Sequence, residues 1–294
     1  SLPIYGQYPG GAPCNVAVAA AQLGAEAHFL GKTGEDAFGS FLRHSLQDFA
    51  VKTDYLLDDP APTPMAFVSL DDDGERSFSF HRTNSADLQY KATDYPEELF
   101  NGEGIFHICS NTLTDTNIRQ TTWDGLALAE KKGFLKSFDV NIRFPLWNNL
   151  DELRPAVLHT IEQSDLIKLS KEELEYLANG QNEEEFIQDY LDKGVSLFLI
   201  SDGPKPMKLY SKILKKSYQP PKVKAVDTTG GGDAFIGGWI YSFLQKGLCS
   251  RDAVTKASAD DLDKSAQYAM QCGAFAVSKR GAWTALPKHD DIQL

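Results

Sequence analysis

The residues best suited to chemistry lie in the stretch Asp227-Thr-Thr-Gly-Gly-Gly-Asp233, which combines three glycines with a carboxylate. Residues 224–226 have the character of a strand end, and apolar residues recur at helical spacing between Phe235 and Leu244, so the glycines open a helix. Backbone N–H groups at a helix start lack helical partners and can hold an anion. An anion site beside a carboxylate suits phosphoryl transfer. A structural turn in which Asp233 only caps the helix explains the same residues equally well.

Two other stretches can present polar groups to a ligand. Gly10-Gly11-Ala-Pro-Cys-Asn15 places two glycines and a carboxamide at a helix start, which suits close approach of the backbone to a polyol. Asn141-Ile-Arg143 follows a strand and offers an amide and a guanidinium, which bind hydroxyl or phosphate oxygens. Taken alone, each stretch is also compatible with an ordinary helix entry or a surface ion pair.

Other candidate motifs carry less weight. Gly31-Lys32-Thr33 fails as a P-loop, because Glu26 stands where that motif requires its first glycine. His107 lies within an apolar strand, which favours a hydrogen-bonded core residue, and the other histidines lack partners at metal-ligand spacing. The cysteines show no zinc or redox spacing, and we expect them to be reduced and mostly buried. They are Cys14, Cys109, Cys249 and Cys272.

The composition excludes several classes of partner. With 24% charged and 42% hydrophobic residues, the chain has the balance of an ordered globular protein. Its net charge is −12, and its basic residues cluster only at 212–216, so nucleic acid is excluded as a partner. The sequence has no apolar run long enough for a membrane span and no signal-peptide layout, so we expect a cytoplasmic location and no membrane partner.

The chain alternates helices and short apolar strands, which predicts an α/β fold with a doubly wound, Rossmann-like and mostly parallel sheet flanked by helices. Expected helices span residues 12–23, 38–46, 123–132, 172–178 and 183–192, with another through Val157. Expected strands span residues 105–109, 135–139, 166–169 and 195–200. Ligands in such sheets bind beyond the carboxyl ends of the strands, so the polar residues that follow the strands are site candidates.

A hairpin is expected at 65–70 and 76–82, on either side of Asp-Asp-Asp-Gly at 71–74. Its residues Phe67, Phe78 and Phe80 require cover, so it either lies over the main domain or pairs with a second subunit, which favours a homodimer.

These motifs together resemble those of the ribokinase-like (PfkB) family of carbohydrate kinases along essentially the whole chain. Gly10-Gly11-Ala-Pro-Cys-Asn15 resembles the amino-terminal signature of the family, and the stretch 227–233 with Ala-Phe-Ile-Gly-Gly resembles the carboxy-terminal one. Three stretches are more similar to fructokinases than to ribokinases. They are the sequence Gly-Gly-Ala-Pro, the sequence Phe-Asp-Val-Asn-Ile-Arg and the closing stretch at 281–287.

The resemblance implies roles for the catalytic and sugar-binding residues. Asp233 would take the proton from the primary hydroxyl of the sugar, and the anion hole would be formed by Gly230, Gly231 and Gly232. A loose transition state releases the proton late, so a well-placed carboxylate suffices as base. The residues implied to hold the sugar are Gly10, Gly11, Asn15, Asn141 and Arg143.

The resemblance also implies sites for ATP and for metal ions. The stretch 201–205 matches a nucleotide loop, and the residues implied to contact the nucleotide are Lys168, Ser170, Ser201, Gly203, Lys205 and Gly273. Ser170 and Glu173 match an Asn-x-x-Glu element beside Mg²⁺ and phosphate, with Ser in place of Asn. A monovalent cation such as K⁺, which many members use, would be held by Asp227, Thr229 and the backbone carbonyls near Ala276 and Gly281.

Four features depart from the family pattern. Members usually begin with a strand that ends in a sugar-binding Asp, which is absent before Gly10, so we expect the full protein to carry a further N-terminal segment. Pro206 stands where a glycine is usual, and Gly273 where fructokinases often carry Asn, which affects nucleotide choice. Gly231 replaces the usual Ala and costs about 0.5–1 kcal/mol of backbone entropy.

We therefore expect a single kinase domain over residues 1–294, with lid strands at about 62–84 and near 3–9. The expected activity is ATP-dependent and Mg²⁺-requiring phosphorylation of fructose to fructose 6-phosphate. Two alternatives remain. One is a kinase for another sugar or sugar acid, such as ribose or 2-keto-3-deoxygluconate. The other is a sugar-binding or nucleotide-binding regulator that has lost catalysis.

Overall fold

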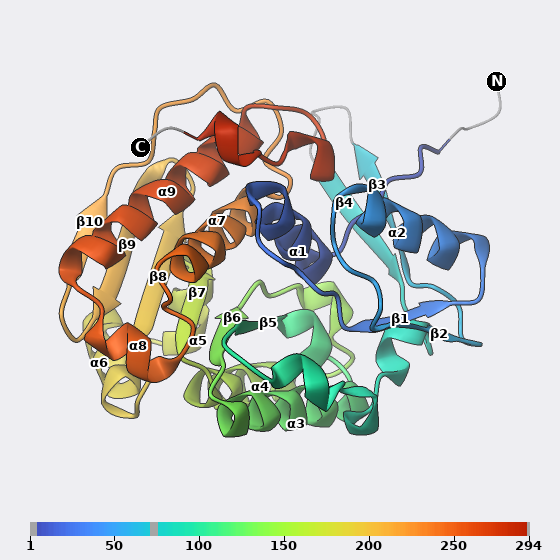
Figure 1. Ribbon diagram of the computed structural model, residues 1–294, viewed down its shortest axis with the longest axis horizontal. Coiled ribbons are helices and arrows are strands. Elements are labelled where there is room, and N and C mark those ends of the chain that lie inside the picture. Colours follow the sequence, from blue (N-terminus) through green and yellow to red (C-terminus); the bar gives the residue numbers. More distant parts are fainter. Residues whose placement is uncertain (1–4, 71–75, 293–294) are drawn as a thin grey trace.

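A six-stranded sheet forms the centre of the protein, in a computed structural model that describes residues 5–70 and 76–292 (Figure 1). Its strands are β5 (Ile105–Cys109), β6 (Leu135–Asp139), β7 (Leu166–Ser170), β8 (Leu197–Asp202), β9 (Lys205–Ser211) and β10 (Lys215–Tyr218). They lie side by side in chain order. The pairs from β5 to β8 are parallel, and β9 and β10 are added antiparallel. The expected mostly parallel α/β sheet is confirmed.

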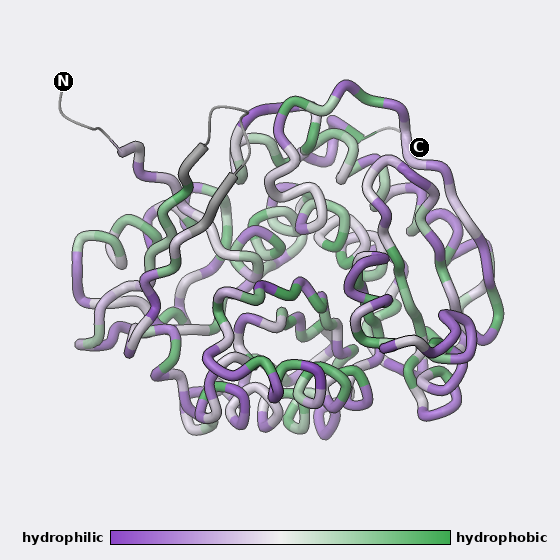
Figure 2. Tube along the Cα trace, turned by 180° about the vertical axis from the view of Figure 1, so that it is seen from behind, coloured by the Kyte–Doolittle hydropathy of each residue, from purple (hydrophilic) through white to green (hydrophobic). Residues whose placement is uncertain are grey.

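Helices cover both faces of the sheet, as the fold class predicts (Figure 1). One face is covered by α3 (Thr116–Lys132), α4 (Leu150–Gln163), α5 (Lys171–Ala178) and α6 (Glu183–Asp192). The other is covered by α1 (Ala12–Leu23), α7 (Gly231–Gln245), α8 (Arg251–Lys256) and α9 (Ala259–Val277). Many peripheral helices alternate hydrophilic and hydrophobic positions along their turns, which is typical of helices that pack on one side only (Figure 2). No helix in the described residues is both long and apolar enough to cross a bilayer.

Alternation along the strands decides which side chains meet α7. Successive side chains of a strand point to opposite faces, and Ile167 and Leu169 of β7 pack with α3 to α6 while Leu166 packs with α7 and α9. Lys168 shares the face of Leu166. Its register partner on β6 is Asp139. The strands therefore present polar residues toward the start of α7.

Helices α1 and α7 cross at very short range. A Cβ at Gly237 would lie 2.5 Å from Ala19 Cβ and 3.2 Å from the backbone nitrogen of Ala20, so only glycine fits in α7 at this point. Helix α1 begins with Pro13 in its first turn and ends at Gly24 in the left-handed conformation, both as expected. The crossing holds the two helix starts beside each other.

The smaller sheets lie beside α1 and α2 (Ala37–Asp48) (Figure 1). The expected hairpin is confirmed as β3 (Met65–Leu70) paired antiparallel with β4 (Arg76–His81). The turn at 71–74 and the side chain of Phe78 lie outside the described residues. Phe67 is 37% exposed, and its ring packs against that of Tyr5 in an edge-to-face arrangement. A lid strand was expected near residues 3–9, but residues 5–9 form no strand. A second sheet, which the sequence did not indicate, pairs β1 (Gly31–Gly34) parallel to β2 (Leu56–Asp59).

Two strand predictions need correction. Residues 224–226 were expected to end a strand, but the last strand before α7 is β10, which ends at Tyr218, and residues 219–226 form no element. Pro220 and Pro221 follow Tyr218 after one intervening residue, and proline cannot donate to a ladder. The strand expected at 195–200 begins and ends two residues later, because the backbone N–H of Val195 bonds to the Tyr190 carbonyl at the exit of α6.

The close crossing of α1 and α7 makes a prediction about stability. Gly237→Ala should lower the free energy of unfolding by about 1–3 kcal/mol, because the new methyl group would overlap Ala19. The double variant Gly237→Ala/Ala19→Gly moves the methyl group between helices and should regain most of that loss. Chemical denaturation measures both variants, with Ala19→Gly alone as control. A Gly237→Ala protein as stable as the wild type would contradict the crossing.

Candidate active site

The start of α7 has backbone N–H groups that lack helical partners, which is the arrangement that the predicted anion site requires. Gly230 takes the left-handed conformation (φ 72°) that favours glycine and forms the N-cap of the helix. The first helical hydrogen bond runs from the Ala234 N–H to the Gly230 carbonyl at 2.7 Å. The N–H groups of Gly232 and Asp233 precede this bond and are not used by the helix, while the Gly231 N–H makes a long contact of 3.4 Å with the Thr228 carbonyl. Such a helix start is suited to an anion such as a phosphoryl group.

Asp233 is held by a chain of hydrogen bonds between buried side chains. Its Oδ2 accepts from Asn15 Nδ2 at 2.7 Å, and Asn15 Oδ1 accepts from Trp283 Nε1 at 2.6 Å. All three side chains are at most 8% exposed. Asn15 was predicted to bind sugar. The structure places its carboxamide on the predicted base, which defines where the carboxylate points.

Asp139 and Lys168 form a buried ion pair beneath the glycine loop. Lys168 Nζ donates to both carboxylate oxygens of Asp139, at 3.0 and 3.2 Å. A Cβ at Gly232 would lie 3.1 Å from the same Nζ, so the ammonium group lies directly against the loop. Lys168 was predicted to contact the nucleotide, and its position next to the anion site agrees with that role.

The charged groups of this cluster shift one another's pKa values. Burial alone would lower the pKa of Lys168, but Asp139, Glu173 and Asp233 together raise it, so this lysine stays charged. Burial raises the pKa of Asp139 to about 7, with Lys168 opposing the rise. Burial also raises the pKa of Asp233 above its ordinary value of 3.8, while the Asn15 hydrogen bond, Lys168 and the exposed Arg143 act to lower it. A raised pKa makes Asp233 a stronger base than a solvated aspartate.

Glu173 lies at the edge of this cluster as the partner of Ser170. Ser170 Oγ accepts from the Glu173 N–H at 3.1 Å, and Glu173 Oε2 accepts from the Ser170 N–H at 2.7 Å, which is a capping box at the start of α5. Oε1 accepts from the Ile142 N–H at 2.6 Å. Within the described residues, the acidic side chains form no group of three that could hold a metal directly.

The predicted monovalent-cation residues are brought together around Asp227. Its Oδ1 accepts from the Thr229 N–H at 2.9 Å, and its Oδ2 accepts from the Gly281 N–H at 3.2 Å. The Asp227 N–H bonds to the Val277 carbonyl at 3.2 Å, next to Ala276. This carboxylate ties the start of the glycine loop to the segment that carries Trp283.

Gly231 and Gly273 are explained by packing between α7 and α9. A Cβ at Gly231 would lie 2.5 Å from Val277 Cγ1, and a Cβ at Gly273 would lie 3.1 Å from the Gly231 carbonyl oxygen. Val277 is β-branched and stiff within a helix. An alanine at position 231 therefore requires Val277 or the start of α7 to shift.

The remaining predicted residues occupy loops. Gly11 is the N-cap of α1 with φ 106°, whereas a Cβ at Gly10 would meet nothing within 4 Å. Asn141 has φ 35°, and its carbonyl accepts from Ser110 Oγ. The nucleotide-loop residues Ser201, Gly203 and Lys205 lie at or next to the tight turn between β8 and β9, where Lys205 is exposed and lies 3.5 Å from Asp202. Ser201 is the register partner of Ser170 on β7, which brings this turn next to the strand end that carries the Ser170–Glu173 pair.

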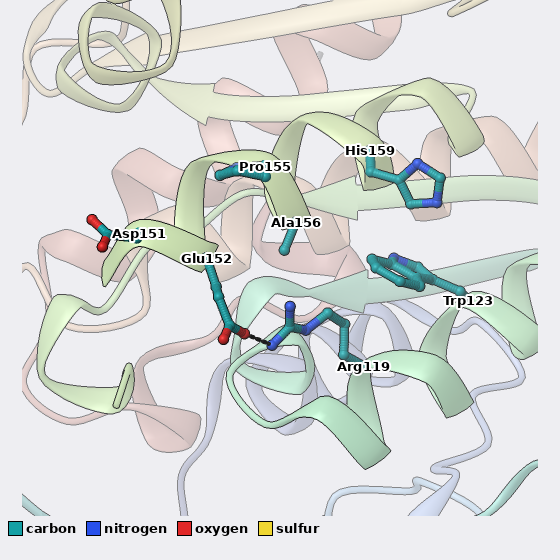
Figure 3. A pocket seen from close by; sticks show the side chains of 7 residues that line it. All are labelled: Arg119, Trp123, Asp151, Glu152, Pro155, Ala156 and His159. Carbon is teal, nitrogen blue, oxygen red and sulfur yellow. Dashed lines mark hydrogen bonds and ion pairs between the residues drawn. The ribbon is translucent and has the colours of Figure 1, made fainter. Parts of the chain in front are cut away.

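A surface pocket between α3 and α4 shares no residue with this cluster. It has a volume of about 470 Å³ and is lined by residues that include Arg119, Trp123 and His159 (Figure 3). The Arg119 guanidinium is paired with Glu152 at 2.5 Å, and the Trp123 and His159 rings pack edge to face. Nothing in its lining resembles the chemistry around Asp233.

Sequence reasoning missed two polar residues of the site. Asp139 and Trp283 both appear in quoted motifs, but neither was assigned a role. Asp139 and Lys168 both lie within predicted strands. The alternation of side chains along these strands could have indicated that Asp139 shares the face of Lys168. Trp283 lies far from Asn15 in the sequence, and no local pattern signals their contact. His107 is confirmed as a hydrogen-bonded residue of the interior, since its Nδ1 lies 2.9 Å from Ser137 Oγ. The four cysteines are free, and all but Cys14 are fully buried.

A mostly parallel sheet with an anion-binding helix start, a buried carboxylate and an adjacent lysine defines a small-molecule phosphotransferase. The chain belongs to the pfkB family of carbohydrate kinases, whose family model matches residues 3–289. Enzymes of this family transfer a phosphoryl group to a hydroxyl group of a sugar, with ATP as the donor.

Relatives and solved structures agree with this family. The chain is 36% identical to "Probable fructokinase-6, chloroplastic" of Arabidopsis thaliana over 99% of its length and 75% of the relative. It is 34% identical to fructokinase-1 of Oryza sativa subsp. japonica over 99% of its length and 88% of the relative. It is similar to a fructokinase of Xylella fastidiosa with bound ATP, with a TM-score of 0.90, 36% identity and coverage of 96% and 88% of the two chains. For a fructokinase of Vibrio cholerae O395 bound to fructose, ADP and calcium, the TM-score is 0.83, the identity 34% and the coverage 95% and 88%.

The buried ion pair makes a prediction that separates stability from activity. Lys168→Met should lower the free energy of unfolding by about 3–5 kcal/mol, because it leaves the Asp139 carboxylate buried without its partner. Lys168→Met/Asp139→Leu should recover most of that stability but little of the kinase turnover, because the positive charge beside Gly232 stays absent. Denaturation and a coupled ADP-release assay measure the two quantities. A double variant with wild-type turnover would show that the lysine is structural only.

Proposed function

We propose that this protein phosphorylates the primary hydroxyl of fructose with ATP and releases fructose 6-phosphate and ADP. The observation that carries the proposal is the placement of Asp233, which ends the anion-binding glycine loop and is fixed by Asn15 at 2.7 Å. The relatives named as fructokinases support fructose as the sugar. A regulator without catalysis would not need a buried, oriented carboxylate at this point.

In the proposed reaction, each residue of the cluster has a defined task. Asp233 accepts the proton of the sugar hydroxyl as its oxygen attacks the γ-phosphorus and the bond to the ADP oxygen breaks. The N–H groups of Gly230, Gly231 and Gly232 stabilise charge on the transferring phosphoryl oxygens. Lys168 adds a full positive charge beneath the loop and stays charged because of its carboxylate neighbours.

Other predicted residues complete the proposed site. Gly10, Gly11, Asn141 and Arg143 hold the sugar, and residues 201–205 with Ser170 and Gly273 contact the nucleotide. Bound Mg²⁺ would supply neutralisation of phosphate charge, and Glu173 would orient its waters. Asp227 and Thr229, with the carbonyls near Ala276 and Gly281, would hold K⁺.

The hairpin β3–β4 is proposed as a lid that excludes water from the transferring phosphoryl group, so that ATP is not hydrolysed. Its partly exposed Phe67 supports a moving cover rather than a fixed core element. A homodimer through this hairpin and a cytoplasmic location stay predictions, and one relative carries "chloroplastic" in its name.

A sugar screen with matched variants tests the proposed function. ADP release is measured with fructose, ribose and 2-keto-3-deoxygluconate, for the wild type, Asp233→Asn and the exposed control Asp252→Asn. We expect fructose to give the highest kcat/KM, Asp233→Asn to lower kcat by about 10²–10⁴ with fructose binding retained, and the control to match the wild type.

Each other result is informative. Turnover on the keto-deoxy acid but not on fructose would replace the proposed substrate. Binding without turnover on any sugar would support the regulator. Unchanged kcat in Asp233→Asn would remove the assigned base.

A further inference from the structure

We propose that Trp283 is a positioning residue, which locks the Asn15 carboxamide in the one orientation that donates a hydrogen bond to Asp233. The inference rests on the proposed role of Asp233 as base. It assigns a function to a residue at the opposite end of the chain from Asn15, in the short helix Trp283–Ala285.

The orientation follows from the donor inventory of the three side chains. An indole N–H can only donate, so the Asn15 atom 2.6 Å from Trp283 Nε1 must be the acceptor Oδ1. The other end of the carboxamide is then Nδ2, which lies 2.7 Å from Asp233 Oδ2 and donates to it. An amide could otherwise be turned either way, and the tryptophan removes that freedom.

The alternative orientation would work against the proposed base. With Oδ1 turned toward Asp233, two acceptor oxygens would face each other unless the carboxyl group held a proton. A protonated Asp233 cannot take the proton of the sugar hydroxyl. Because all of these groups are buried, water is poorly placed to relieve the mismatch.

The surroundings of Trp283 suit a fixed donor. Its ring is 3% exposed and packs edge to face on Phe49, with centroids 5.6 Å apart. Just before it, Gly281 has φ 101° and donates its N–H to Asp227 Oδ2. Asp227 opens the glycine loop that Asp233 closes. The loop is therefore tied at both ends to one short segment that carries Trp283.

Other charged or titratable groups also face Asp233, and a test must separate them from the hydrogen bond. They are Lys168 on β7, Arg143 after β6, Asp139 on β6 and Cys109 on β5. None of them contacts Trp283, so a change at Trp283 leaves their charges in place.

The main experiment compares two buried tryptophans. Trp283→Phe removes the donor, while Trp239→Phe removes an indole N–H that has no hydrogen-bond partner in the described structure. The dependence of kcat/KM for fructose on pH is measured for both variants and the wild type. We expect the midpoint of the acidic limb to rise by about one pH unit in Trp283→Phe and to stay unchanged in Trp239→Phe. Loss of a donor to the Asp233 carboxylate favours its protonated form and so raises its pKa. As the pH is lowered, the variant therefore loses activity at a higher pH than the wild type does.

A double-mutant cycle tests whether Trp283 acts through Asn15. Asn15→Leu should shift the acidic limb at least as far as Trp283→Phe, and Trp283→Phe should add no further shift in the Asn15→Leu background. If Trp283→Phe does not fold, the benzothiophene analogue of tryptophan at position 283 keeps the ring shape without the N–H and replaces it in the same assay.

The outcomes separate this inference from the proposed function. An acidic limb that is unmoved in Trp283→Phe or its analogue, with turnover changed no more than in Trp239→Phe, would overturn the positioning role and leave only packing. Additive shifts in the cycle would also overturn it. Wild-type kcat in Asp233→Asn would instead overturn the proposed base, independently of Trp283.

Discussion

The site depends on the short approach of α1 to α7, where the absence of a side chain at Gly237 lets Ala19 lie against the α7 backbone. Asn15 lies one turn before Ala19, and Asp233 lies one turn before Gly237, so the same crossing brings these two polar side chains to 2.7 Å. A larger residue at position 237 would move the helix starts apart. The geometry of the proposed base is thus set by an apolar contact one turn away from it.

Electrostatics then decides what the assembled groups can do. Strand alternation turns Asp139 and Lys168 toward the start of α7, where they meet Asp233 in a region with little solvent. Burial favours neutral carboxyl groups, and the buried Lys168 counteracts it while remaining charged. The N–H groups at the start of α7 that the helix does not use supply further positive potential. The result is a carboxylate of raised pKa, the proposed base, beside the proposed phosphate site.

Local patterns predicted the parts of this structure that local physics controls. Apolar periodicity and Gly24 predicted the helix over residues 12–23, and alternation of apolar and polar residues predicted the hairpin. Gly230 and the glycines after it predicted the start of α7. The strand expected at 224–226 was wrong, since the backbone there bonds to the end of α9, with the Val226 N–H donating to the Val277 carbonyl, and not to a strand of the described structure. The Asn15 to Trp283 contact, the Asp139 to Lys168 pair and the match of Gly231 with Val277 join segments distant in the sequence, and only tertiary packing determines them.

The most direct test of the account is a crystal structure of the protein with fructose and a non-hydrolysable ATP analogue. The account predicts the primary hydroxyl of the sugar within about 2.6–3.2 Å of Asp233, with Asn15 Nδ2 still donating to the same carboxylate. It also predicts the γ-phosphate on the N–H groups of the glycine loop. A sugar hydroxyl or a γ-phosphate bound away from Asp233 and this loop would contradict it.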